Sequence, residues 1–312
     1  MSTVVLGVGA SHSTLMNTNW GEVETVDRAI AFRDGLQRAS GIVDRARPDA
    51  VVIVGSNHFR GFWLDLLPAF TIGVGECHMS GESGTPEGPI SIDGQLALHL
   101  CRSLFAADFD PAFSTRIQVD HGITHAVQYL LAELDVPIVP IVVNVFAPPL
   151  PSLSRVERFG RVMSEAIAGD GEDKRVVVIA SGGLSHRLPF PDWAAPETDD
   201  DRFLVSAWTD GRTNWRDYDP RRRQIIRAAT PGVNPDFDAE VLDLLSRGRI
   251  AELAAWPVER LVAEGGNGAN ELRTWLMMAA SCGHAPAETI VYSPMPEWLT
   301  GMAVAVIEEP SR

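Results

Sequence analysis

Three histidines in this sequence occur at the same kind of position, shortly after an apolar run that ends in small residues. The three segments are V-V-L-G-V-G-A-S-H up to His12, V-V-I-V-G-S-N-H up to His58, and V-V-V-I-A-S-G-G-L-S-H up to His186. Each apolar run is typical of a buried strand. Imidazole is a general ligand for zinc, iron, copper and nickel, so imidazoles that converge would suit a metal site.

These histidines meet only if their strands lie side by side and parallel. A helical pattern over residues 22–46 separates the first two strands, which makes a β-α-β unit with parallel strands. Parallel strands end at a common edge of the sheet, where α/β proteins bind ligands. We therefore expect an α/β fold: a central mixed, largely parallel sheet with helices on both faces and a metal site at the C-terminal strand edge.

A carboxylate would complete a metal site of two histidines and one acid, the arrangement of non-haem Fe(II) oxygenases. Glu271 opens the segment N-E-L-R-T-W after a loop rich in Gly and Asn. A carboxylate in the first turn of a helix also interacts favourably with the helix dipole, and spacing alone favours that role. The other candidates are Asp120, Glu240 and Glu264.

The motif Q-V-D-H-G places Asp120 next to His121. A histidine near neutral pKa suits general acid or base catalysis, and an adjacent carboxylate can orient an imidazole. The alternative is that Asp120 caps the helix that follows. The pair alone does not decide between these roles. We assign structural roles to the other histidines: His78, His99, His125 and His284.

Two polar segments are expected to be irregular or solvated. Residues 76–89 are rich in Gly, Pro, hydroxyls and acids, which predicts a long loop. Residues 198–223, rich in Asp, Arg and Trp, are interpreted as a solvated excursion. From residue 237 the chain is expected to be helical and to supply Glu271 to the strand-end edge. We expect one catalytic domain spanning residues 1–312.

Composition excludes several classes of partner. The 312 residues include 41 acidic and 26 basic side chains, a net charge of -15, which argues against nucleic acid and anionic membranes. The first apolar run is too short for a signal peptide, and no apolar stretch approaches the roughly 20 residues that span a bilayer. The 3 cysteines form no C-x-x-C motif. We therefore expect a cytoplasmic protein without a disulfide framework.

Five motifs in order resemble a known family. They are G-A-S-H-S (9–13), S-N-H-F (56–59), Q-V-D-H-G (118–122), S-G-G-L-S-H (181–186) and N-E-L-R-T-W (270–275). Together they resemble the type III extradiol ring-cleaving dioxygenases, the superfamily of the protocatechuate 4,5-dioxygenase β subunit. The similarity spans almost the whole chain and is strongest to members that cleave 2,3-dihydroxyphenylpropionate.

The resemblance implies a role for each matching residue. It implies that His12, His58 and Glu271 bind Fe(II), and that His121 and His186 transfer protons, with Asp120 beside them. His186 thus becomes an acid/base residue rather than a ligand. The resemblance does not say which of the two histidines is the acid and which the base.

The implied reaction inserts both atoms of O2 into a substituted catechol with meta ring cleavage. The expected substrate resembles 2,3-dihydroxyphenylpropionate, although another catechol or a 2-aminophenol is an alternative. Two rival functions are a zinc-dependent hydrolase and a non-catalytic metal-binding module on the same fold. We expect a homo-oligomer rather than a chain that needs a separate small subunit.

The ring substituent is where the sequence departs from the family pattern. Arg60 follows S-N-H-F, and Arg187 follows His186. Either guanidinium would suit a bidentate pair with a substrate carboxylate. Both are therefore candidate substrate-binding residues, with an ordinary surface or loop role as the alternative.

Overall fold

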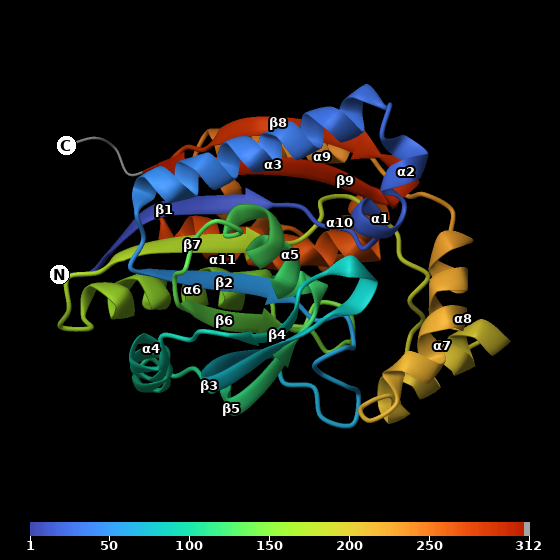
Figure 1. Ribbon diagram of the computed structural model, residues 1–312, viewed down its shortest axis with the longest axis horizontal. Coiled ribbons are helices and arrows are strands. Elements are labelled where there is room, and N and C mark those ends of the chain that lie inside the picture. The colour runs from blue at the N-terminus through green and yellow to red at the C-terminus, as the bar shows by residue number, and fades with distance from the viewer. Residues whose placement is uncertain (309–312) are drawn as a thin grey trace.

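A nine-stranded mixed sheet forms the centre of the protein in a computed structural model, which describes residues 1–308. Its middle contains four parallel strands in the order β6, β2, β7 and β1, and Figure 1 shows them running toward one common edge. Their bounds are β1 (Thr3–Ala10), β2 (Ala50–Ser56), β6 (Ile138–Val143) and β7 (Arg175–Ser181). The expected mixed α/β sheet with a parallel centre is confirmed.

Antiparallel strands extend the sheet on both sides. Beyond β1 lie β9 (Thr300–Glu308) and β8 (Glu288–Met295). Beyond β6 lies β3 (Phe70–Ser80), which pairs with β4 (Glu87–Ile90) and β5 (Ala112–Val119). The long loop expected over residues 76–89 is therefore wrong in large part. Strand pairing holds both ends of that segment, and only the short helix η1 (Glu82–Gly84) and its flanks lie between them.

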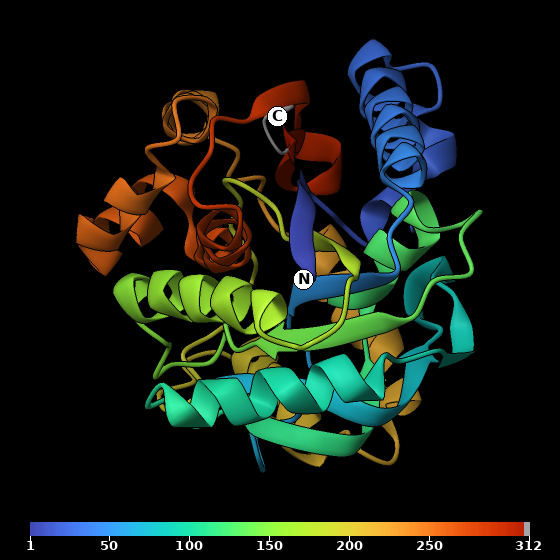
Figure 2. The same ribbon diagram turned by 90° about the vertical axis from the view of Figure 1, so that its left-hand side faces the viewer.

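Helices cover both faces of the sheet, as Figure 2 shows in the view along the strands. One face carries α3 (Asp27–Ala46) and α5 (His121–Leu130), and the other carries α4 (Gly94–Ala106), α6 (Leu153–Ala168) and α11 (Leu272–Ser281). Shorter or more peripheral helices are α1 (Leu15–Thr18), α2 (Trp20–Val23), α9 (Pro235–Ser246), η2 (Ile250–Ala255), α10 (Val258–Gly265), η3 (Asn267–Glu271) and η4 (Pro296–Trp298), and α7 and α8 are described below.

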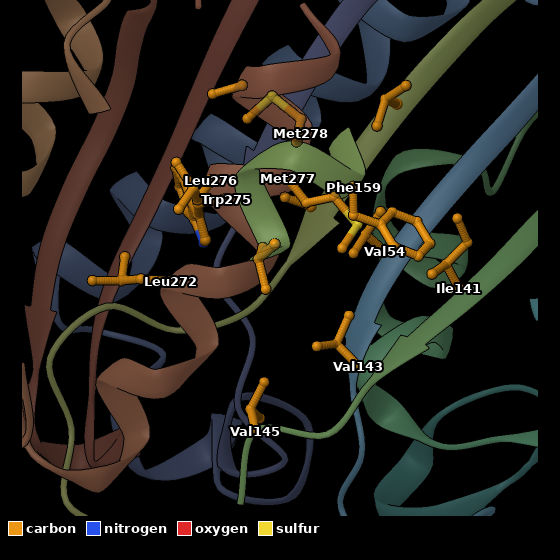
Figure 3. Packing of buried hydrophobic residues seen from close by; sticks show 14 of the residues in the cluster. Val54, Ile141, Val143, Val145, Phe159, Leu272, Trp275, Leu276, Met277 and Met278 are labelled. Carbon is orange, nitrogen blue, oxygen red and sulfur yellow. The ribbon is translucent and has the colours of Figure 1, made fainter. Parts of the chain in front are cut away.

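The central strands are buried on both faces, so their side chains pack into two hydrophobic cores, one on each side of the sheet. On β2, Val51 and Ile53 pack on the side of α3 and α5, whereas Val52 and Val54 pack on the side of α6 and α11. This alternation follows from the two-residue period of a strand. Figure 3 shows the second core, where Val54 faces side chains such as Phe159 and Met277.

The segment expected to be a solvated excursion instead forms two amphipathic helices, α7 (Asp199–Asp210) and α8 (Trp215–Arg227). They lie beyond the C-terminal strand edge (Figure 1). Trp208 is fully buried and stacks on Phe59, with ring centroids 4.3 Å apart. The expectation fails because each helix buries one face, which includes Trp208 on α7 and Trp215, Asp219 and Arg222 on α8. Within residues 1–308, no helix combines the length and apolar character needed to cross a bilayer.

Candidate metal centre and active site

The strand ends bring His12 and His58 together. The central strands are in register, so that Ala10 and Gly55 both pair with Ser181 on the strand between them. The rings of His12 and His58 have centroids 5.2 Å apart and are buried. Nδ1 of His12 is hydrogen-bonded to Ser181 Oγ at 2.9 Å, whereas its Nε2 is buried and has no hydrogen-bond partner within residues 1–308.

Asp120 positions His58 and caps α5 at the same time. Its Oδ2 accepts a hydrogen bond from the His58 backbone N–H at 2.7 Å, and its Oδ1 lies 3.4 Å from His58 Nδ1. Oδ1 also accepts a hydrogen bond from the backbone N–H of Gly122 at 3.0 Å, so Asp120 caps the N-terminus of α5 as well. Burial opposes a charge on His58, but hydrogen bonds to Asp120 and Glu271 outweigh it and raise its pKa to about 9.

Glu271 is fully buried and points into the space between the histidines rather than capping its helix. Its Oε1 lies 3.4 Å from His12 Nε2 and 3.3 Å from His58 Nε2. Ser56 Oγ donates a hydrogen bond to the same oxygen. Burial alone would raise the pKa of Glu271, but the neighbouring imidazoles hold it well below its usual range. The carboxylate is therefore ionised at neutral pH.

This donor set fits a divalent metal ion. The partnerless Nε2 of His12, the Nε2 of His58 and Oε1 of Glu271 face one another, and two imidazoles with one carboxylate suit iron and related metals. One nitrogen of His121 also lies within 4.8 Å of nitrogens of His12 and His58, so an all-histidine set is a geometric alternative. We favour Glu271 as the third donor because a separate carboxylate already engages His121.

That carboxylate belongs to Glu82, which the sequence did not single out. Glu82 is buried, and its Oε1 accepts hydrogen bonds from both the backbone N–H and Nδ1 of His121, at 3.1 and 2.7 Å. Because an ionised carboxylate only accepts, Nδ1 of His121 carries the proton and Nε2 is left free. Burial and the nearby His58 hold the pKa of His121 well below its usual value.

His186 lies on the other side of Glu271, with its Nε2 3.6 Å from Oε2. Its Nδ1 donates to the Leu184 carbonyl oxygen at 2.9 Å, which fixes the ring and leaves Nε2 toward the site. Gly268 packs directly against this ring, where any Cβ would fall within 2.3 Å of its atoms. Burial lowers the pKa of His186, so the imidazole is neutral at pH 7.

A pocket opens beside these groups. Five residues expected from the sequence line it: His12, His58, His121, His186 and Glu271. Asp120 is buried immediately behind His58. The rest of the wall is Ser13, Thr14, Leu15, Leu188, Phe190, Arg222, Ile226, Trp298, Leu299 and Thr300. The site is therefore polar at its histidine end and largely apolar elsewhere.

The two arginines expected to bind substrate do not line this pocket. Phe59 has a positive φ of 59°, and the chain turns there so that Arg60 is buried against other charges. Its Nη2 donates to Asp219 at 2.6 Å, and its Nε lies 3.4 Å from Glu82. Arg187 is exposed and donates to the Val262 carbonyl oxygen at 3.5 Å. The structure corrects their expected role for this reason.

Arg222 lines the pocket instead, and sequence reasoning missed it. The chain reads R-R-R at residues 221–223, which is typical of a solvated face. Helical geometry turns each residue by about 100° from the last, so the middle arginine points inward. The available signal was the pattern of Trp215, Asp219 and Arg222, the buried residues of α8.

Comparisons with known proteins agree with this geometry. Residues 7–303 match the family model described as the catalytic LigB subunit of aromatic ring-opening dioxygenase. A Rhodococcus sp protein named 2,3-dihydroxyphenylpropionate/2,3-dihydroxicinnamic acid 1,2-dioxygenase is 35% identical over 309 residues, covering 94% of this chain and 95% of that protein. A protein of the same name from Mycolicibacterium smegmatis is 33% identical over 308 residues, covering 94% and 95%. The chain therefore belongs to the LigB family of extradiol, aromatic ring-opening dioxygenases.

Proposed function

We propose that this enzyme is an Fe(II)-dependent extradiol dioxygenase that cleaves a substituted catechol resembling 2,3-dihydroxyphenylpropionate. The observation that carries the proposal is the convergence of His12, His58 and Glu271 on one side of a pocket that His121 and His186 flank. The names of the relatives support the same substrate class.

His12, His58 and Glu271 would hold the metal through Nε2, Nε2 and Oε1. Fe(II) held there would supply the redox chemistry that couples oxidation of a catechol to reduction of dioxygen. The protein contributes the orientation of its ligands. Ser181 fixes the ring of His12, Asp120 fixes that of His58, and Ser56 holds the carboxylate of Glu271.

His121 is proposed as the general base that takes a proton from a catechol hydroxyl. Its Nδ1–H is donated to Glu82, so Nε2 is the atom that accepts. The carboxylate of Glu82, hydrogen-bonded to Nδ1, would stabilise the imidazolium that forms. His186 has only a neutral carbonyl behind its Nδ1, so it is proposed as the second proton carrier, which returns a proton during ring opening.

The test separates metal binding from proton transfer. The purified variants His12→Ala, His58→Ala and Glu271→Ala should lose bound iron after anaerobic reconstitution with Fe(II). In contrast, His121→Ala and His186→Ala should retain iron and lose roughly 10²- to 10⁴-fold in turnover. Iron content, O2 uptake and visible absorbance of the ring-opened product are the readouts. Wild-type turnover in either of the last two variants would disprove that residue's role.

The wild-type protein provides the test of the reaction itself. Adding air and a panel of catechols to the Fe(II)-loaded protein should consume one O2 per catechol and give a yellow product. The Zn(II)-loaded protein is the control and should consume none. Bound iron without O2 uptake on any catechol would refute extradiol cleavage.

A further inference from the structure

Arg222 is a buried cation in the wall of the active-site pocket. It comes from α8, is only 3% exposed, and its Nη2 donates to the His58 carbonyl oxygen at 3.2 Å. That carbonyl belongs to the backbone and carries no net charge. Within residues 1–308 the guanidinium therefore hydrogen-bonds to a neutral carbonyl beside the site and to no carboxylate.

The nearest carboxylates are already engaged. Asp219 lies 4.0 Å from Arg222 Nη1, but its two oxygens accept hydrogen bonds from Arg60 and Arg223. Glu82 is hydrogen-bonded to His121. Nε of Arg222 has no hydrogen-bond partner within residues 1–308.

A buried charge in this state is costly, because its nearest counterion, Asp219, is 4.0 Å away and is shared with two other arginines. Burial and the neighbouring Arg60 lower the pKa of Arg222 to about 10, which still leaves it protonated at neutral pH. An anion entering the pocket would offset this cost.

The other residues of the pocket indicate what kind of molecule would carry that anion. Arg222 is the one Lys or Arg among the pocket-lining residues of the described chain, and Leu188, Phe190 and Ile226 provide apolar wall. A ligand with an aromatic ring, a short apolar stem and a terminal anion matches this arrangement. The planar fork of a guanidinium pairs best with a carboxylate.

We infer that Arg222 binds the carboxylate of the ring substituent and thereby sets the enzyme's preference for anionic catechols. This inference rests on the proposed function and adds the residue that selects the substrate. Helix α8, which is remote from the strand ends in the sequence, then acts as the specificity element of the site.

The experiment compares 3-(2,3-dihydroxyphenyl)propionate with its primary amide, which has nearly the same shape and no charge. Wild-type enzyme should prefer the acid in kcat/KM. The Arg222→Gln variant should lose roughly 100-fold of this preference, mainly through a higher KM for the acid. Arg222→Lys should retain part of it, because it keeps the charge but not the fork. The matched control is Arg221→Gln, which removes the adjacent, exposed arginine that pairs with Asp200, and it should keep the wild-type preference.

Several results would overturn the inference. One is wild-type enzyme that handles acid and amide equally. Another is an Arg222→Gln variant that keeps its preference for the acid. A third is a loss of kcat that is the same on both compounds, because it would show that Arg222 only supports the backbone of His58. If Arg222→Gln does not fold by circular dichroism, Arg222→Lys and the wild-type comparison still decide the matter.

A binding measurement separates this inference from the proposed reaction. Calorimetric titration of the wild-type protein with 3-phenylpropionate and 3-phenylpropanamide involves no ring cleavage. Tighter binding of the acid, weakened in Arg222→Gln, would support the role of Arg222 even if no catechol were cleaved. Equal binding of acid and amide would overturn it even if ring cleavage were demonstrated.

Discussion

At the residue scale, the site is defined by which nitrogen atom each histidine presents. The Nδ1 atoms of His12, His121 and His186 are engaged by Ser181, Glu82 and the Leu184 carbonyl, respectively. The Nε2 atoms are therefore left for the metal or the substrate. Partners behind a ring fix its orientation and tautomer, so the protein prepares these histidines without help from a ligand.

Glu82→Gln tests whether the carboxylate behind His121 matters to the reaction. The variant removes the charge that would stabilise protonated His121, and kcat should fall about 10- to 100-fold. Iron content should stay at the wild-type level, because Glu82 is not expected to bind the metal. Steady-state kinetics and iron analysis are the measurements.

Two further variants control this prediction. Glu76→Gln changes an exposed carboxylate on β3 that pairs with Arg116, and it should leave kcat unchanged. Glu82→Asp keeps the charge at a shorter reach and should recover part of the rate. A Glu82→Gln enzyme with normal kcat would show that His121 works without its carboxylate.

At the element scale, the close approach of α5 to β2 brings His121 next to His58. A Cβ at Gly122 would fall 2.1 Å from the Ser56 carbonyl oxygen, and one at Gly55 would fall 2.2 Å from that of Gly122. Real Cβ atoms do not approach backbone this closely, so both positions require glycine. The ring centroids of His58 and His121 lie only 3.8 Å apart as a result.

Gly122→Ala should push the start of α5 away from β2. The added methyl meets backbone rather than a flexible side chain, so the free energy of unfolding should fall by about 2–3 kcal/mol. Denaturant unfolding followed by circular dichroism measures this change. Gly21→Ala is the control, because its Cβ would have nothing within 4 Å, and its stability should stay within about 0.5 kcal/mol of wild type. Equal stability of the two variants would contradict the close contact.

A second element-scale feature is the attachment of α8 to the body of the protein. Asp219 accepts hydrogen bonds from Arg60 on one side and from Arg223 on its own helix on the other. Arg60 in turn approaches Glu82, the partner of His121. This buried chain of charges joins the helix that carries Arg222 to the loop that orients His121.

Asp219→Asn should therefore loosen α8. Leaving Arg60 with a weaker set of partners in a buried place should reduce the local opening free energy by about 3 kcal/mol. Backbone amides of α8 should exchange hydrogen with solvent roughly 100-fold faster, which mass spectrometry can follow. Asp217→Asn, on the exposed face of the same helix, should show no change. Unchanged exchange in Asp219→Asn would indicate that apolar contacts alone hold α8.

At the scale of the whole molecule, the proposed metal ligands come from distant parts of the chain. His12 follows the first strand, His58 follows the second, and Glu271 precedes α11 near the C-terminal end. The unfolded chain does not hold these donors together, so a metal ion should bind the native state almost exclusively. Metal binding and global stability are linked for this reason.

Metal removal should lower the thermal midpoint of the protein. Restoring Fe(II) to about 100 times its Kd should stabilise the native state by about 2.7 kcal/mol and raise Tm by roughly 4 °C. Anaerobic differential scanning calorimetry measures the shift. His12→Ala should abolish it, whereas His78→Ala changes an exposed histidine and should retain it. A metal-dependent shift that survives in His12→Ala would place the metal elsewhere.

Local sequence patterns predict the parallel centre of the sheet and most of the candidate site, but not the strands β3 and β4. Apolar runs that end in small residues and histidine predict buried strands and their polar ends. Both features can be predicted because they depend on residues that are adjacent in the sequence. The family motifs then singled out Glu271, which local spacing had left as a helix-capping residue. All five of the residues expected to bind metal or move protons line one pocket.

Only the tertiary structure decided the partners of those residues. Glu82 and Arg222 lie in segments whose local sequence predicts a loop and a solvated face, and no short-range pattern indicates that each is buried beside a histidine of the pocket. Conversely, Arg60 and Arg187 follow functional motifs directly but point away from the pocket. The direction and burial of a side chain depend on the elements that pack against it, and these come from distant parts of the chain. Here the packing of α5 and α8 against the sheet sets both.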